Sequence, residues 1–365
     1  MAPAFSSTRQ AAAFTLLLLL LLLLPVIAGK SVLPPREEIY STLGWRYGPY
    51  HYLHRQIFEE KGDVDIAIIG SSRVLHGLDT PYVQKQLSEA LGRKATVITL
   101  GYSWAGFDAL YFITKDLLQN RQVRLIVFAE ECRGSDNPHH AAPYLFRFAD
   151  DRSALEGLPF PQRAAYYFGA ILGMPRNLLG LFRSNYPGQS PEAAGAWQRD
   201  LRAPDPAERL GAAYARLGFD HAPAKFVEYQ PAARAQPSDV RTYSPATRDL
   251  FQFQGPPAPP LQLHFARRFA ALVRGHGSKL LCLHFPEINE IRALVIQERE
   301  LWPEALGTDV TVAGIPPAKL FEGLADEEVL KLFLDPYHFN KNGQDYFTPL
   351  VTPTLIQTCI DRHEP

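Results

Sequence analysis

Short apolar runs alternate along this chain with segments of helical periodicity. Strands that are covered on both faces read as continuous apolar runs, and amphipathic helices repeat every three to four residues. Runs of the first kind predict strands at residues 65–69, 96–100, 124–129, 279–284 and 309–312. The periodic segments between them predict helices at residues 80–91, 107–118, 262–274 and 287–302. This alternation predicts an α/β fold with a mostly parallel five-stranded sheet.

The alternation stops between residues 134 and 260. This stretch is rich in alanine, proline, arginine and aromatic residues, with helical pieces predicted at 162–172 and 206–217. A structureless loop of this length is improbable in a compact domain, so we predict a large helical insertion that caps one edge of the sheet. The predicted organisation has four parts. Residues 1–30 are a targeting segment, residues 31–133 are the first half of the α/β domain with a lead-in that packs on it, residues 134–260 are the inserted cap, and residues 261–365 are the second half of the domain.

The first thirty residues form a membrane-directed segment. Residues 10–29 carry no charge and include nine consecutive leucines, Leu16 to Leu24. A cleaved signal peptide needs an apolar region of about 7–15 residues, whereas a spanning helix needs about 20. Both interpretations remain open, with a cleavage site after Ala28 for the first, and we favour the uncleaved anchor. Either way, the rest of the chain is expected outside the cytoplasmic membrane, anchored in the cell envelope (the periplasm) or secreted.

Composition and charge exclude some classes of partner. The 365 residues are 46% hydrophobic, enough for a sizeable core, and the net charge of −1 gives no reason to expect nucleic acid as a partner. The three cysteines, Cys132, Cys282 and Cys359, are too widely spaced for a metal site, so no metal or cofactor is predicted. Cys282 lies in an apolar run and is expected to be buried, and one disulfide between two of the three remains open.

The end of the first predicted strand carries a candidate nucleophile. Ligands of parallel α/β sheets bind outside the carboxyl ends of the strands, and Gly70-Ser71-Ser72 follows the first strand directly. A serine in such a turn can present both its hydroxyl and its backbone N–H to a substrate carbonyl. The alternative is that the serines only cap the following helix.

A second candidate group lies before the last helix, where Asp335 and His338 are three residues apart. In a turn, this spacing lets the carboxylate hold one ring nitrogen while the other accepts a proton from a serine hydroxyl. The alternative is an Asx turn made by Asp335 next to a packed imidazole.

Together, Gly70-Ser71-Ser72, Asp335-Pro336-Tyr337-His338 and Gly343 resemble the SGNH/GDSL hydrolase superfamily. The resemblance implies a three-layer α/β/α sandwich with a flavodoxin-like sheet. It also implies a catalytic triad of Ser72, His338 and Asp335. Shifting the alignment by one residue would make Ser71 the nucleophile instead.

The resemblance also implies an oxyanion hole. Its donors would be the backbone N–H of Ser72 and that of Gly101, in Leu100-Gly101-Tyr102-Ser103 after the second strand. The alternative for Gly101 is a plain turn glycine. The asparagine that the family carries after its third strand is absent from its usual place, where this chain has Glu130-Glu131-Cys132. Asn137, further along that loop, is the candidate replacement.

Features that are less specific than the triad resemble the membrane-anchored branch of the superfamily, whose members act in the acylation of cell-envelope polymers. These are the apolar amino-terminal segment, Gly-Ser-Ser in place of Gly-Asp-Ser, and the long insertion. They imply an esterase or an O-acyltransferase acting on an acylated carbohydrate or a small ester, with a membrane-bound O-acyltransferase as partner in the second case. The competing hypothesis is a non-catalytic envelope protein that binds carbohydrate or an assembly partner. Flavodoxin-type nucleotide binding is disfavoured because no glycine-rich phosphate loop follows the first strand.

Other polar residues receive structural interpretations. Arg73 is expected on the surface at a helix start, and His139-His140 in a solvated loop. His76, His276 and His284 are expected to be packed or on the surface rather than to bind a ligand.

Overall fold

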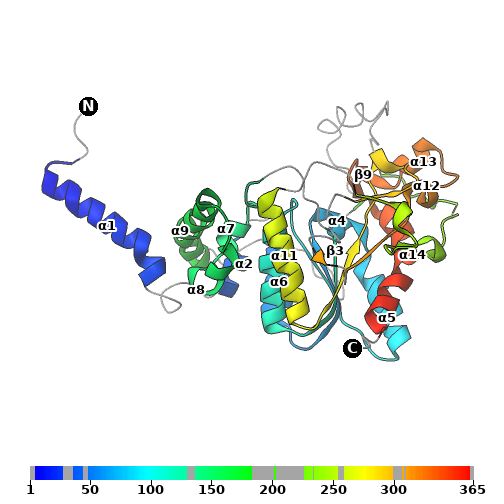
Figure 1. Ribbon diagram of the computed structural model, residues 1–365, viewed down its shortest axis with the longest axis horizontal. Helices are drawn as coiled ribbons and strands as arrows, with labels where there is room; N and C mark the ends of the chain where they lie inside the picture. Colours follow the sequence, from blue (N-terminus) through cyan, green and yellow to red (C-terminus); the bar gives the residue numbers. More distant parts are fainter. Residues whose placement is uncertain are drawn as a thin grey trace.

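The structure is a computed structural model that describes residues 5–27, 36–43, 48–129, 136–182, 201–202, 226–232, 234–253, 259–298, 306–307 and 310–361. Its centre is a mostly parallel six-stranded sheet with helices on both faces, a three-layer α/β arrangement (Figure 1). The predicted α/β class and mostly parallel sheet are confirmed.

Five of the six strands correspond to the predicted ones, each shifted by no more than two residues at either end. In sheet order the strands are β2 (Val97–Gly101), β1 (Val64–Gly70), β3 (Val123–Ala129), β6 (Lys279–Leu283), β8 (Thr311–Gly314) and β4 (Arg241–Thr242). The first five are parallel, and β4 pairs antiparallel with β8. The prediction of five strands was wrong by one. β4 has only two residues and no apolar run, and it lies in the segment predicted to be a helical cap.

Two helical layers cover the sheet and create two separate cores. On one face lie α6 (Phe107–Asn120) and α11 (Pro260–Gly275), and on the other α4 (Ser72–Gly77), α5 (Thr80–Leu91) and α14 (Lys341–Ile360). Aromatic rings dominate the first core, where Phe128 of β3 packs edge-on against Phe107 and Phe269. Cys282 of β6 is 1% exposed, which confirms its predicted burial.

The lead-in packs on the first face, as predicted. It consists of α2 (Arg36–Thr42), α3 (Tyr50–His54) and a π-helical turn at Arg55–Glu59. Tyr40, Tyr50 and Tyr52 are at most 1% exposed. The Tyr40 hydroxyl donates a 2.6 Å hydrogen bond to Asp116 of α6, which fixes the lead-in to the body. Trp45 and Tyr47 lie outside the described residues.

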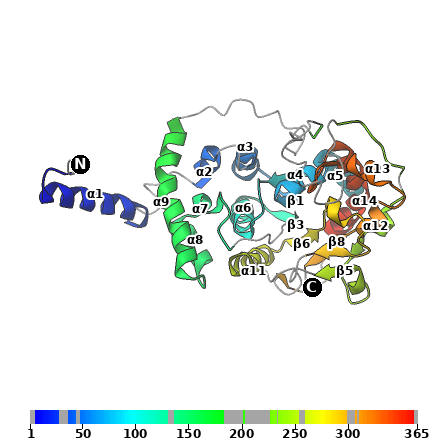
Figure 2. The same cartoon turned by 90° about the horizontal axis from the view of Figure 1, so that it is seen from above.

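Within the predicted insertion, the described helices form an extra layer at one end of the body. They are α7 (Ala142–Leu145), α8 (Phe148–Asp151), a 3-10 turn at Arg152–Leu155 and α9 (Phe160–Phe182). Figure 2 shows α9 beside α2 and α7, outside the α6 layer rather than over the carboxyl ends of the strands. The helix predicted at 162–172 is therefore present and longer, and the one predicted at 206–217 lies outside the described residues.

The predicted helix at 287–302 was wrong. The structure has a 3-10 turn at Ile288–Glu290 and a short strand β7 (Ile296–Glu298), which pairs with β5 (Phe251–Phe253). The backbone of this segment bonds to other parts of the chain: Ile288 N–H donates to the Pro336 carbonyl at 3.0 Å. Tertiary hydrogen bonds therefore override a helical pattern of apolar positions.

The amino-terminal helix α1 (Thr8–Ile27) projects from the body beyond α9 (Figures 1 and 2). Its residues Leu16 to Leu21 are 45–59% exposed. No helix in the described ranges combines the length and the apolar character needed to cross a bilayer.

Candidate active site

Strand β1 and helix α4 present Ser72 at the carboxyl edge of the sheet. The sheet order places β1 and β3 side by side at the point where the connections reverse direction, which is where ligands bind in such sheets. Gly70 ends β1, and a Cβ there would lie 2.6 Å from the Ala129 carbonyl oxygen, so only glycine fits. Ser71 is the N-cap residue of α4 and is buried, and Ser72 is the first residue of the helix.

A short hairpin presents the other two residues. It is formed by β9 (Phe333–Asp335) and β10 (His338–Phe339), which are antiparallel and precede α14. One carboxylate oxygen of Asp335 accepts the backbone N–H groups of Tyr337 at 2.8 Å and His338 at 3.0 Å. The two carboxylate oxygens also lie 2.8 and 2.7 Å from His338 Nδ1. The Asx turn and the carboxylate–imidazole pair, which the sequence left as alternatives, are therefore both present.

The structure brings Ser72 and His338 together across 266 residues of sequence, with Ser72 Oγ 2.7 Å from His338 Nε2. Because Asp335 accepts at Nδ1, the proton of the neutral ring belongs on Nδ1, and Nε2 is left to accept the serine proton. It is the hydroxyl of Ser72 rather than that of the buried Ser71 that meets the imidazole. This is the hydrogen-bonded chain that a serine nucleophile needs.

Asp335 is held in its ionised form. Burial raises the pKa of Asp335, but the hydrogen bond and charge of His338 and the N–H of Tyr337 lower it by more, so that the net pKa lies below its ordinary value. The buried ring of His76 packs on His338, with 4.9 Å between ring centroids. An ionised, largely buried carboxylate stabilises the imidazolium that forms when His338 takes a proton.

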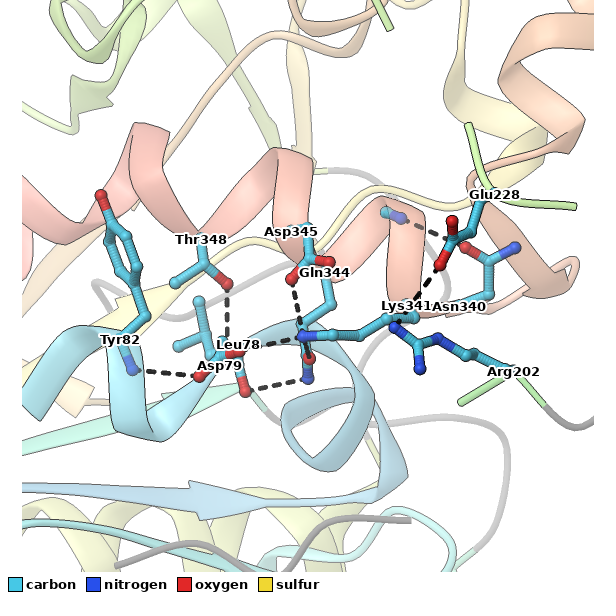
Figure 3. A network of polar contacts seen from close by, with 11 residues as sticks. Leu78, Asp79, Tyr82, Arg202, Glu228, Asn340, Lys341, Gln344, Asp345 and Thr348 are labelled. Atoms are coloured by element: carbon cyan, nitrogen blue, oxygen red, sulfur yellow. Dashed lines mark hydrogen bonds and ion pairs between the residues drawn. The ribbon is translucent and has the colours of Figure 1, made fainter. Parts of the chain in front are cut away.

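A network at the start of α14 fixes the hairpin relative to the segment that carries Ser72 (Figure 3). Lys341 Nζ donates to Asp79 at 3.0 Å and to Asp345 at 2.6 Å. Gln344 donates to the Leu78 carbonyl at 3.1 Å, and Asp79 N–H donates to Thr348 at 3.0 Å. These contacts tie α14 to the α4–α5 connection, so the two halves of the site are held in register.

Gly343 of the recognised motif has a packing role. A Cβ at this position would lie 2.2 Å from the Leu332 carbonyl oxygen, where α14 crosses the chain before the hairpin. Asn340 caps the helix by accepting the Gly343 N–H at 3.2 Å and donates to the Lys331 carbonyl at 2.9 Å. Glycine and asparagine together therefore set the exit of the hairpin into α14.

The oxyanion donors implied by the resemblance stay predictions. Gly101 ends β2 opposite Gly70, and a Cβ there would lie 2.1 Å from Leu75 Cγ of α4. Packing of α4 therefore explains the absence of a side chain at Gly101, which is the last residue of β2 rather than the plain turn glycine of the alternative interpretation. Asn137 is exposed on the loop after β3, and residues 130–135 of that loop lie outside the described residues.

A buried ion pair beside Ser72 was missed by the sequence analysis. Arg73, expected on the surface, is only 13% exposed in its side chain and lies 3.3 Å from Glu287, which is 4% exposed. His284 Nε2 lies 3.4 Å from Glu290 in the same loop after β6. The guanidinium of Arg73 therefore reaches from the end of β1 past β3 to the end of β6. In the sequence, the one indication that Arg73 lies at the site was its position directly after Ser72.

The expectation of a solvated loop at His139 was wrong. Its side chain is 5% exposed, and its backbone N–H donates to Asp108 at 2.8 Å. Nε2 lies 2.8 Å from the Ser103 carbonyl, and Nδ1 accepts the Ala141 N–H at 3.1 Å. The neutral tautomer protonated on Nε2 satisfies both contacts, so His139 joins the loops after β2 and β3. Its neighbour His140 is exposed, as expected.

These contacts predict a stability that depends on pH. Burial lowers the pKa of His139, only partly offset by the charge of Asp108. The unfolded chain then binds a proton that the folded chain does not, so stability is complete above the ordinary histidine pKa of about 6.5 and falls as the pH drops below it. Urea unfolding at pH 7.5 and at lower pH measures how steeply the free energy of unfolding falls as the pH drops. This dependence should be weaker in His139→Gln than in the wild type, by at most about 1.4 kcal/mol per pH unit. Equal slopes would contradict this assignment.

Among the residues that the structure describes, no group of three or more histidine, cysteine, aspartate or glutamate side chains is placed to hold a metal ion. Comparison of the chain with models of protein families, with curated proteins and with solved structures found no match. The chemistry of the site is therefore argued from its own residues: a serine hydroxyl, an imidazole and an ionised carboxylate in one hydrogen-bonded line.

Proposed function

We propose that the protein is a serine hydrolase or O-acyltransferase of the SGNH type, acting on an ester through Ser72, His338 and Asp335. The observation that carries the proposal is the continuous chain of contacts from Ser72 Oγ to His338 and from His338 to Asp335, at 2.7 and 2.7 Å. A serine hydroxyl is a weak nucleophile unless a base removes its proton, and general-base assistance contributes about 10²–10⁴-fold.

The proposed reaction has two steps. In the first, Ser72 Oγ attacks the ester carbonyl carbon while His338 Nε2 takes the hydroxyl proton. Asp335 stabilises the imidazolium, which then protonates the leaving alkoxide as the ester bond breaks. In the second step, water or an acceptor hydroxyl gives its proton to His338 and attacks the acyl-Ser72 ester. His338 then returns this proton to Ser72 Oγ as the bond between the acyl carbon and Oγ breaks, which releases the acid or the new ester and restores the serine hydroxyl.

The proposed substrate is an O-acyl group on a carbohydrate or envelope polymer outside the cytoplasmic membrane. This part of the proposal rests on the family resemblance and on the apolar amino-terminal segment. A membrane-bound O-acyltransferase would supply the acyl group if the second step is transfer.

Labelling with a fluorophosphonate probe tests the proposal. The full chain and Ser71→Ala should be labelled covalently, because the probe reacts with an activated serine hydroxyl, and Ser72→Ala should not. Mass spectrometry of the labelled peptide should place the adduct on Ser72. Labelling that persists in Ser72→Ala would move the nucleophile elsewhere, and a folded wild-type chain without labelling would favour the non-catalytic binding protein.

A further inference from the structure

The part of helix α9 whose side chains the structure describes, residues 160–171, has an inner side that packs on the body and an outer side with exposed phenylalanines. On the inner side, Tyr166 is fully buried and donates a 2.6 Å hydrogen bond to Asp108 of α6. Gly169 lies so close to α7 that a Cβ would be 2.2 Å from Pro143. On the outer side, Phe160 and Phe168 are 69% and 62% exposed. Phe168 is two positions from Tyr166, which is about 200° around a helix and therefore opposite it.

The outer side of α9 continues the apolar surface of the amino-terminal helix. Figures 1 and 2 show α9 crossing the end of the body from which α1 projects, with α1 and α9 as neighbours there. The exposed leucines of α1, Leu16 to Leu21, show no polar side. Exposed apolar surface on this scale marks an interaction site rather than a solvated face.

The composition of α9 gives no repulsion from an anionic lipid surface. Between residues 160 and 182 the sequence has no aspartate or glutamate. Exposed phenylalanine side chains are typical of helices that lie in the boundary between lipid headgroups and acyl chains. A protein partner of the usual kind would be expected to meet a more mixed polar rim.

We propose that α9 is a lipid-contacting helix, which lies in the headgroup region of the same bilayer that α1 enters and inserts Phe160 and Phe168. This rests on the proposed membrane location of α1 but does not require that α1 crosses the bilayer, and it is independent of catalysis by Ser72. Because α7 and α2 lie between α9 and the sheet, the bilayer would hold the triad at a fixed orientation above its surface. The triad would then lie away from the lipid surface, on the far side of the α6 layer.

Spin labelling of the full chain in nanodiscs of phosphatidylethanolamine and phosphatidylglycerol tests this. Nitroxides are attached at Phe160→Cys and Phe168→Cys in a Cys132→Ser background, since Cys282 and Cys359 are buried. Both labels should be severalfold more accessible to oxygen than to a water-soluble nickel chelate. A matched control is Leu294→Cys, another large apolar residue that is 78% exposed, where the nickel chelate should have the better access.

Each other outcome overturns the proposal. Labels at 160 and 168 that behave like the label at 294 would place α9 in water. Labels shielded from both agents would show that a second copy or another part of this chain covers α9. Full-length chain that does not stay with the nanodiscs on size-exclusion chromatography would show that the protein does not bind this lipid. None of these results depends on fluorophosphonate labelling of Ser72, so failure of the lipid contact and failure of the proposed catalysis are distinguishable.

Discussion

Replacing His338 by alanine is expected to lower kcat for a simple aryl ester by about 10⁴–10⁶-fold, because the triad acts as a unit. Without the imidazole, the Ser72 hydroxyl keeps its proton and Asp335 has nothing to orient. Adding Ser72→Ala to His338→Ala should then cost little more, since the residual rate comes from binding and backbone dipoles alone. Steady-state hydrolysis of p-nitrophenyl acetate by the wild type, the two single variants and the double variant measures this.

The matched control is His276→Ala, which removes an exposed histidine at the opposite end of the molecule. Its kcat should equal that of the wild type within about twofold, because this side chain does not contact the triad. The fold should also be unaffected, since surface substitutions usually change the free energy of unfolding by no more than about 0.5 kcal/mol. Losses from His338→Ala and Ser72→Ala that multiply in the double variant would show that the two side chains act independently. That result would remove the general-base role from His338 even if each single variant were slow.

The parallel sheet could be predicted from the sequence because its strands are buried on both faces. Val64–Gly70 and Val123–Ala129 each carry five or more consecutive apolar or glycine residues, and the only charged residues in them are Asp65 and Arg124, next to their first residues. The helix predicted at 80–91 is α5, which spans Thr80–Leu91 and has Pro81 in its first turn, although its N-cap is Asp79. In these elements the local sequence pattern agrees with the burial in the folded protein, so the pattern is sufficient to predict where they lie.

The contact between Ser72 and His338 could be inferred only through the resemblance, because no local rule joins residues 266 positions apart. The charges around them were missed for a different reason. Arg73 and Glu287 are buried together as a pair of opposite charges, and either one alone would be expected at the surface. A composition rule that places charged residues outside fails wherever two distant segments bring opposite charges together.

The same reasoning explains the two incorrect elements. Residues 287–302 have apolar positions at helical spacing, yet the Ile288 N–H donates to Pro336 of the β9–β10 hairpin and residues 296–298 pair with β5, which no sequence period encodes. Arg241–Thr242 forms an edge strand that is held by β8 rather than by its own residues. Short edge elements owe their conformation to a neighbour, and the neighbour lies far away in the sequence.

Replacing Asp108 by alanine is expected to destabilise the fold by about 2–6 kcal/mol, because two buried donors lose their acceptor at about 1–3 kcal/mol each. Asp108 is fully buried and accepts the Tyr166 hydroxyl at 2.6 Å and the His139 backbone N–H at 2.8 Å. It thereby joins α6, α9 and the loop after β3. Such a loss is a large part of a typical stability of 5–15 kcal/mol, and urea unfolding monitored by circular dichroism measures it.

A second substitution separates the loss of this hydrogen bond from a general loss of packing. Tyr166→Phe alone should cost about 1 kcal/mol, since Asp108 keeps the His139 N–H and the ring stays in place. In the Asp108→Ala background, the Tyr166 hydroxyl is a buried donor without an acceptor, so the same Tyr166→Phe change should now raise stability. Asp249→Ala is the control, because that side chain is 97% exposed and should cost almost nothing. If Tyr166→Phe costs as much in Asp108→Ala as in the wild type, the hydroxyl has found another partner. In that case the coupling of α9 to α6 must come from ring packing, which the contacts of Tyr166 with Phe112 and Phe265 would then have to supply.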